Sequence, residues 1–135
     1  RADTFADLGG FDHELRATGY EDIDLSLRLW MSGYNIYLDP QIRVLHKFRK
    51  IRPYTVSEDN IIFNFLRVAF KLFDEKRIKI AVDHTRHHNC FADVLMQVLC
   101  SDVWEERIKW QSKRKYDDNW FFNNIYKLNN NIADY

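Results

Sequence analysis

The chain has 135 residues, of which 46% are hydrophobic and 16% aromatic, a size and composition typical of one folded domain rather than a disordered protein. Twenty basic residues balance twenty acidic ones, which argues against a dedicated nucleic-acid binder or a polybasic membrane binder. No apolar run approaches the ~20 residues of a transmembrane helix, so we expect no transmembrane segment.

The glycine-containing first quarter of the chain predicts two elements. Residues 2–8 favour a short helix that Gly9 and Gly10 end. Residues 23–30 are ambiguous, because they alternate apolar and polar side chains like a half-buried strand but are rich in Leu and have acids at their start. If this segment is a helix, Gly33 supplies its end. Periodicity alone leaves both structures open.

The next elements change from short strands to long helices. Residues 34–38 and 42–45 are predicted as β-strands that flank an Asp39-Pro40 turn. Ser57 predicts a helix start, and apolar residues recur behind it at helical spacing as far as Phe73. Another helix is expected over residues 91–99, with an extension to Trp110 as an option. The tail from residue 117 has room for one more helix.

Cysteines, histidines and aromatic residues of the second half favour structural roles. Cys90 and Cys100 are too few for a disulfide framework, so we expect both to be reduced and buried. His84 and His88 have the i, i+4 spacing of some zinc sites, but without a third ligand in register a simple histidine cluster is favoured. A set of aromatic residues toward the C-terminus could stack on sugar rings but is expected to be core instead: Trp104, Trp110, Tyr116, Trp120, Phe121 and Phe122.

Three acids, Glu21, Asp22 and Asp24, follow Gly19 within a few residues. Crowded carboxylates repel one another, so proton affinity rises unless a cation or a substrate compensates. Such a cluster can supply a general base, bind sugar hydroxyls or lie near a metal. Taken alone, the cluster favours the alternative of an acidic helix N-terminus that the helix dipole stabilises.

The segment from residue 40 to residue 57 is basic. It contains five Lys and Arg side chains and His46 but no acid, in a chain that is otherwise neutral. Arginine offers two parallel hydrogen bonds to phosphate oxygens, so the asymmetry indicates an anion site. A solvated surface loop is the alternative.

These motifs together resemble a known family. Residues 8–12, 19–30 and 33–34 resemble, in this order, the C-terminal half of family-2-like glycosyltransferases of the GT-A fold. Residues 44–50 and 52–54 are similar to the matching segment of polypeptide N-acetylgalactosaminyltransferases. The resemblance implies an α/β fold, in which residues 1–75 form the C-terminal segment of a GT-A domain with few short strands and residues 76–135 form a helical extension. It also implies that residues 21–32 are a helix.

The resemblance carries catalytic roles onto three residues. Glu21 and Asp22 match the acidic pair at the acceptor side, where inverting relatives use the Asp as general base. His46 matches the histidine that completes the coordination of a catalytic Mn²⁺ (or Mg²⁺). This combination suits sugar transfer, since a base must deprotonate the acceptor while a cation stabilises the departing diphosphate.

Substrate contacts are implied for four residues. Arg49 and Tyr54 match the mobile loop that closes over the sugar nucleotide, and Gly19 belongs to the acceptor-side motif. Arg52 stands where the N-acetylgalactosaminyltransferases have a His, so donor contacts there are expected to differ. The segment around Gly19 also lacks the family's Trp and has Asp22 where the family has Asn. These departures shift the segment toward the inverting pattern and leave the retaining or inverting outcome open.

The expected function is therefore transfer of a hexose or N-acetylhexosamine from a nucleotide sugar, a UDP-sugar, to a hydroxyl of a carbohydrate or protein acceptor. The chain starts without Met and has no Asp-x-Asp or Asp-x-His motif at a strand end, so we expect an inactive piece of a larger enzyme. Its open strand edges predict self-association. A bacterial cytoplasm is the expected location, or the Golgi lumen if the parent is eukaryotic. The alternative function is a non-catalytic helical protein-interaction module.

Overall fold

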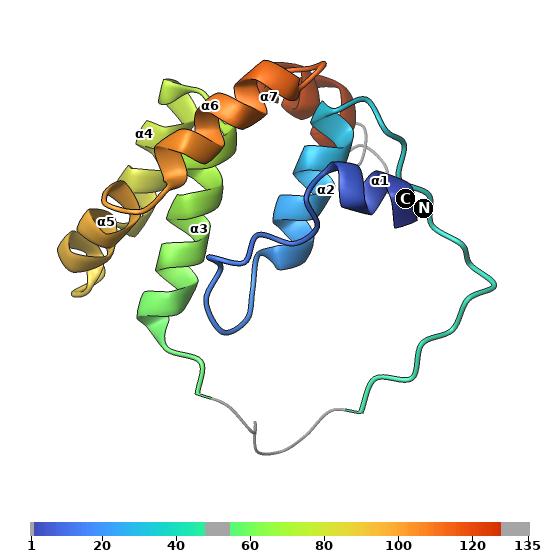
Figure 1. Cartoon of the computed structure of the whole chain (residues 1–135). Coiled ribbons are helices and arrows are strands. Elements are labelled where there is room, and N and C mark those ends of the chain that lie inside the picture. The colour runs from blue at the N-terminus through green and yellow to red at the C-terminus, as the bar shows by residue number, and fades with distance from the viewer. Residues whose placement is uncertain (1, 48–54, 128–135) are drawn as a thin grey trace.

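A computed structural model describes residues 2–47 and 55–127 of the chain, and its regular structure there is helical (Figure 1). The helices are α1 (Ala2–Asp7), α2 (Glu21–Met31), α3 (Glu58–Leu72), α4 (Glu75–Thr85), α5 (Phe91–Leu99), α6 (Val103–Lys113) and α7 (Asp118–Phe121), and the π-helical segment η1 (Phe122–Tyr126) follows α7 directly. The helices expected at residues 2–8, 21–32 and 91–99 are thus confirmed. None of the described helices is long and apolar enough to cross a bilayer.

The α/β expectation is wrong for the described residues, which contain no strand. Residues 34–38 and 42–45, predicted as strands, follow an irregular path outside the helices (Figure 1). Alternating apolar side chains form a strand only when a neighbouring strand pairs with the main chain, and no described segment does so here. The side chains of Leu38 and Leu45 consequently remain 92% and 98% exposed.

Local capping explains most helix starts. The side chain of Ser57 accepts a hydrogen bond from the Asn60 amide at 3.3 Å, as the sequence predicted, and Asp74 caps α4 in the same way. Helix α2 differs from both. Its N-cap residue, Tyr20, has φ +74° and makes no side-chain cap, so the entry to α2 is fixed by contacts outside the helix.

Helix α3 is the centre of the bundle and contacts α2, α4, α5 and α6. One core cluster joins α3 to its partners α4, α5 and α6, with Phe63 and Leu66 at most 1% exposed and packed in the same cluster as Val94 and Val98. This core draws side chains from both sides of residue 75, where we placed the boundary between the two expected domains.

A second core cluster joins α2 to α3 and α6 through Leu27, Met31, Leu72 and Trp110. Trp110 is 4% exposed, as expected for a core aromatic, whereas Trp104, expected in the core as well, is 43% exposed. Trp110 reaches this cluster because the helical structure is interrupted between α5 and α6. The single helix from residue 91 to residue 110, which the sequence allowed as an option, does not form. The break directs α6 back across α3 toward α2 (Figure 1).

The cysteines follow the sequence expectation only in part. Both are free thiols. Cys90 is half-buried, but Cys100 is exposed, so the expectation that both are buried is wrong. Cys100 follows the last residue of α5, where the chain turns at the surface before α6.

Candidate acceptor-side site

The three acids at the start of α2 have three different environments. Glu21 is half-buried, and its Oε2 accepts a hydrogen bond from the Gly19 amide at 2.7 Å. Asp22 is exposed, and its Oδ1 accepts from the Ile23 amide at 2.8 Å. Asp24 is fully buried. Asp22 is therefore the most accessible of the three acids, while the carboxylates of Glu21 and Asp24 are engaged in holding the structure.

The loop before α2 has an unusual backbone. Ala17, Gly19 and Tyr20 all have positive φ angles of 49°, 101° and 74°. Residues other than Gly at such angles cost of order 1–3 kcal/mol each, and the surrounding structure must enforce them. Such strain is typical of positions that orient a functional group, and this loop leads directly into Glu21 and Asp22.

Asn64 of α3 enforces the loop. Its fully buried side-chain amide donates to the carbonyls of Arg16 and Gly19, each at 2.9 Å, and its Oδ1 accepts from the Arg16 amide at 2.8 Å. A Cβ added at Gly19 would approach Cδ1 of Ile61 to 3.3 Å. The loop thus lies tightly on α3, which satisfies its main-chain groups where no helix does.

Buried ion pairs also hold α2 against α3. The ammonium of Lys71 in α3 lies 2.5 Å from Asp12 and 2.6 Å from Asp24, and all three side chains are at most 5% exposed. Arg28 donates to Asp24 at 2.8 Å and to the carbonyls of Leu8 and Gly10. Each buried charge thus has an opposite partner, which is the condition for tolerating it.

Arg67 extends this network to the start of α6. Its guanidinium pairs with Asp12 at 2.9 Å and with Asp102 at 2.7 Å. Burial by itself raises the pKa of Asp12, but the hydrogen bonds and charges of Arg67 and Lys71 outweigh it and hold the pKa well below its ordinary value. Burial likewise lowers the pKa of Arg67, and the two aspartates more than reverse this.

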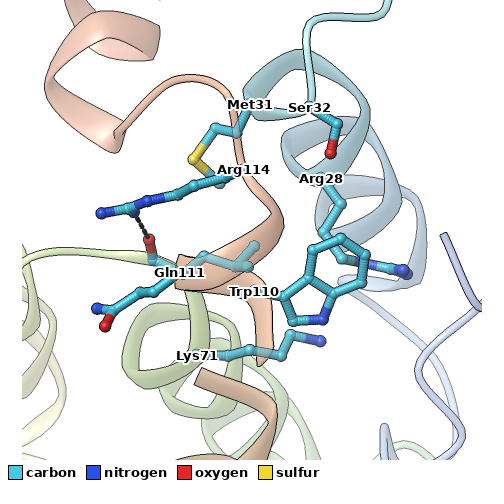
Figure 2. Close-up of a pocket in the computed structure, with 8 residues that line it drawn as sticks. Arg28, Met31, Ser32, Lys71, Trp110, Gln111 and Arg114 are labelled. Carbon is cyan, nitrogen blue, oxygen red and sulfur yellow. Dashed lines mark hydrogen bonds between the residues drawn. The ribbon is translucent and has the colours of Figure 1, made fainter. Parts of the chain in front are cut away.

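The small hollow at this network is not a ligand site. Figure 2 shows the indole of Trp110 beside the side chains of Arg28 and Lys71. Arg114, which also lines the hollow, donates a hydrogen bond to the Leu72 carbonyl at 3.2 Å. The hollow measures about 10 Å³, which is at most the room of one water molecule. Its charged side chains therefore serve the packing of α2, α3 and α6.

Two larger hollows flank the start of α2. One, of about 360 Å³, has Asp22 in its lining together with Trp30, Phe122 and Tyr126. The other, of about 290 Å³, lies between α3 and α4 beside Tyr20 and is called here the α3–α4 hollow. Both approach the size of small-molecule sites, so the acids at the start of α2 lie between two surfaces that could receive parts of a substrate.

His46 lies on the exposed segment that leaves α2. The described residues contain no group of three or more His, Cys, Asp and Glu that could hold a metal ion. A cation at His46 would need ligands beyond those this part of the chain brings together. The other predicted substrate residues, Arg49, Arg52 and Tyr54, lie outside the described residues.

The histidines form the cluster that the sequence favoured over a zinc site, with ring centroids 6.4 Å apart for His84 and His87 and 4.2 Å apart for His87 and His88. Helix α4 ends at Thr85, so His84 and His88 do not share a helix face. Both nevertheless line the α3–α4 hollow. There Nδ1 of His88 lies 2.8 Å from Oε1 of Glu58, a residue that sequence reasoning treated only as part of a helix start.

Sequence reasoning also missed Asn64 and Lys71. Both were placed inside an apolar helical run and were given no role. One signal in the sequence could have found them. Each is a polar residue at a position that the helical period of α3 places in the core, and a buried polar side chain requires a hydrogen-bond or ion-pair partner.

Comparisons with known proteins point to one family. Probable N-acetylgalactosaminyltransferase 8 from Caenorhabditis elegans is 34% identical over 129 residues, 93% of this chain and 28% of the relative. Polypeptide N-acetylgalactosaminyltransferase 11 from Xenopus tropicalis is 30% identical over 88% of this chain and 19% of the relative. Polypeptide N-acetylgalactosaminyltransferase 16 from Homo sapiens is 31% identical over 90% of this chain and 21% of the relative.

The chain spans between 19% and 28% of the length of these relatives. No protein-family model and no solved structure matches it. The relatives are animal proteins, which favours the eukaryotic alternative over the bacterial origin expected from the sequence. Through these matches over most of its length, the chain is a homologue of one segment of the polypeptide N-acetylgalactosaminyltransferases.

Proposed function

We propose that this chain forms the acceptor side of a glycosyltransferase. That enzyme moves an N-acetylhexosamine or a hexose from a nucleotide sugar, a UDP-sugar, to a hydroxyl of a protein or carbohydrate acceptor. The observation that carries the proposal is the exposed carboxylate of Asp22 at the start of α2, behind a strained loop that Asn64 holds. The names of the relatives support N-acetylgalactosamine as the sugar.

In this proposal Asp22 accepts the proton of the acceptor hydroxyl. The hydroxyl oxygen forms the new glycosidic bond to the anomeric carbon, while the bond to the diphosphate breaks and the diphosphate keeps the electron pair. Glu21 acts as a positioning residue, because its carboxylate already holds the Gly19 amide at 2.7 Å. A base placed in this way contributes roughly 10²–10⁴-fold to the rate of such transfers.

The donor side rests on the resemblance. We assign Arg49, Arg52 and Tyr54 to contacts with the sugar nucleotide and His46 to one ligand of Mn²⁺ or Mg²⁺. Such a cation, when bound, neutralises charge on the departing diphosphate. Since the relatives are several times longer than this chain, the remaining donor contacts are proposed to come from parts of the enzyme that this chain does not cover. The isolated chain is proposed to be inactive.

Two experiments test this function. Calorimetric titration of the isolated chain with UDP-N-acetylgalactosamine and Mn²⁺ should show no micromolar binding, and turnover of the sugar nucleotide would contradict the proposed inactivity. In the whole protein that contains this segment, Asp22→Asn should lower the rate of sugar transfer about 100-fold or more. Asp93→Asn, an exposed acid in the first turn of α5, is the control. An Asp22→Asn enzyme with the wild-type rate would make the base role wrong.

A second candidate, a helical protein-interaction module, has one observation in its favour. The segment after α2 exposes large apolar side chains, with Tyr37 at 83%, Leu38 at 92%, Val44 at 85% and Leu45 at 98%. Exposed apolar segments of this kind mark surfaces that associate. We propose that the isolated chain associates with itself through this segment.

For the parent enzyme we propose the Golgi lumen as the compartment, because the relatives are animal proteins.

A further inference from the structure

The α3–α4 hollow has the size and lining of a small-molecule site. It measures about 290 Å³, near the lower end of the ~300–1,000 Å³ typical of ligand pockets. Its apolar wall includes Ile61 and Phe65 of α3, with Tyr20 from the loop before α2. The rings of Tyr20 and Phe65 lie 5.7 Å apart between centroids. One side of the hollow is therefore apolar and largely aromatic.

The other side is polar. Glu58 and His88 line it as a hydrogen-bonded pair, with Oε1 and Nδ1 2.8 Å apart. Each residue has a second polar atom: Nε2 of His88, and Oε2 of Glu58, which accepts a 4.0 Å contact from the Cys90 thiol and has a further lone pair for a ligand. The hydroxyl of Thr85 already donates its hydrogen bond to the Ala81 carbonyl at 2.9 Å, so it can only accept one from a ligand. The pair thus presents an acceptor and an imidazole nitrogen next to aromatic rings.

The charges of the residues that line the α3–α4 hollow limit the class of ligand that it can bind. None of the described residues that line the hollow is Lys or Arg, and the carboxylate of Glu58 repels anions such as phosphate. A cationic ligand would compete with His88, which is already paired with that carboxylate. A metal ion lacks a third ligand, since the described residues form no such group. A neutral ligand with both apolar and hydroxyl surfaces remains.

A pyranose ring has both surfaces. Its C–H groups carry partial positive charge and suit the negative face of an aromatic ring, while its hydroxyls both donate and accept hydrogen bonds. We infer that the α3–α4 hollow binds a neutral monosaccharide unit. Its position beside Tyr20, the residue before Glu21, makes it a subsite for a sugar already present on the acceptor, and this second step rests on the proposed function.

The experiment titrates the whole chain with small-molecule probes and monitors its chemical shifts by heteronuclear NMR. The probes are galactose and N-acetylgalactosamine, with galactose 6-phosphate and choline as charged comparisons. We expect saturable shifts with a millimolar dissociation constant, confined to Tyr20, Phe65, His84 and His88. Glu58→Ala and His88→Ala should each weaken binding about tenfold, because each removes a hydrogen bond to the ligand. Glu75→Ala, an exposed acid in the first turn of α4, should leave it unchanged.

The possible outcomes separate this inference from the proposed transfer reaction, because binding is measured without turnover. Saturable shifts at the hollow support the subsite even if Asp22 is not a base. Absence of saturable shifts with both neutral sugars, or shifts clustered elsewhere, overturns it. Tighter binding of choline or of galactose 6-phosphate than of galactose also overturns it, in favour of a charged ligand. Circular dichroism of Glu58→Ala and His88→Ala confirms that both variants remain folded.

Discussion

The side-chain amide of Asn64 donates to the carbonyl of Gly19 at 2.9 Å and so fixes the main chain two residues before Glu21. The same side chain exchanges two hydrogen bonds with Arg16. A single residue of α3 thereby replaces the side-chain cap that α2 lacks. The direction in which α2 presents Asp22 is consequently a property of α3.

Asn64→Asp should loosen this loop without changing the volume of the side chain. The carboxylate cannot donate to the carbonyls of Arg16 and Gly19, and it places buried negative charge beside both oxygens. We expect a loss of about 2 kcal/mol in the free energy of unfolding, measured by urea denaturation. Hydrogen exchange of amides 16–21 should be faster. Asn89→Asp, the same change at an exposed position, is the control, and equal effects of the two would contradict the assignment.

Gly19→Ala should destabilise the chain for two separable reasons. Its φ of 101° strains an L-residue, and the new Cβ approaches Cδ1 of Ile61 to 3.3 Å. Gly9→Ala shares the positive φ, 77°, but meets no atom within 4 Å, so it measures strain alone. We expect about 1–2 kcal/mol from strain and an additional cost at Gly19. Ile61→Val removes Cδ1 and should recover part of that cost in the double variant, while strictly additive effects would exclude the contact.

Lys71→Met tests whether the ammonium compensates the two buried carboxylates. The variant keeps the length of the side chain but leaves Asp12 and Asp24 without a positive charge that lies 2.5 and 2.6 Å away. We expect the free energy of unfolding to fall by about 3–5 kcal/mol. Lys76→Met, at an exposed position of α4, should change it by less than about 0.5 kcal/mol. A small effect at Lys71 would show that the carboxylates are compensated by the arginines alone.

The sequence predicted those elements whose causes are local. Ser57 caps α3 as expected because the hydrogen bond spans three residues, and the helix over residues 91–99 follows its own apolar face. Residues 34–38 failed as a strand because a strand depends on a partner, and none of the described segments pairs with them. Local pattern therefore predicted these two helices but not the outcome at the two expected strands, which require a distant neighbour, and it left the segment that forms α2 open between strand and helix.

The break between α5 and α6 could not be predicted for a similar reason. Arg67 of α3 reaches both Ser101 and Asp102 across more than thirty residues of sequence. The candidate site likewise combines features that the local sequence shows with features that depend on distant residues. The acids at 21–24 stand out in the sequence, but their environments depend on Asn64 and Lys71, which look like ordinary interruptions of an apolar face.

Acid should destabilise the chain through Asp12. Its pKa in the folded chain lies below the ordinary value of 3.8, so the unfolded chain binds the proton more readily. The stabilisation from Asp12 is complete above about pH 4 and is lost as the pH falls through the folded pKa. Urea denaturation across this range should show a steep decline for the wild type. Asp12→Asn, less stable at neutral pH, should decline less steeply, and parallel profiles would show that other carboxyls cause the loss.

Self-association should depend on the exposed segment after α2. Leu38 and Leu45 are 92% and 98% exposed, and burying such side chains between copies is favourable by roughly 25 cal/mol per Å² of apolar surface. Light scattering should show an apparent mass that rises with concentration for the wild type but not for Leu38→Ser/Leu45→Ser. The control pair, Ile80→Ser/Ile108→Ser, removes exposed isoleucines from α4 and α6 and should associate like the wild type. A wild-type chain that stays monomeric at high concentration would contradict the proposal, and association that persists in the leucine variant would place the contact on another surface.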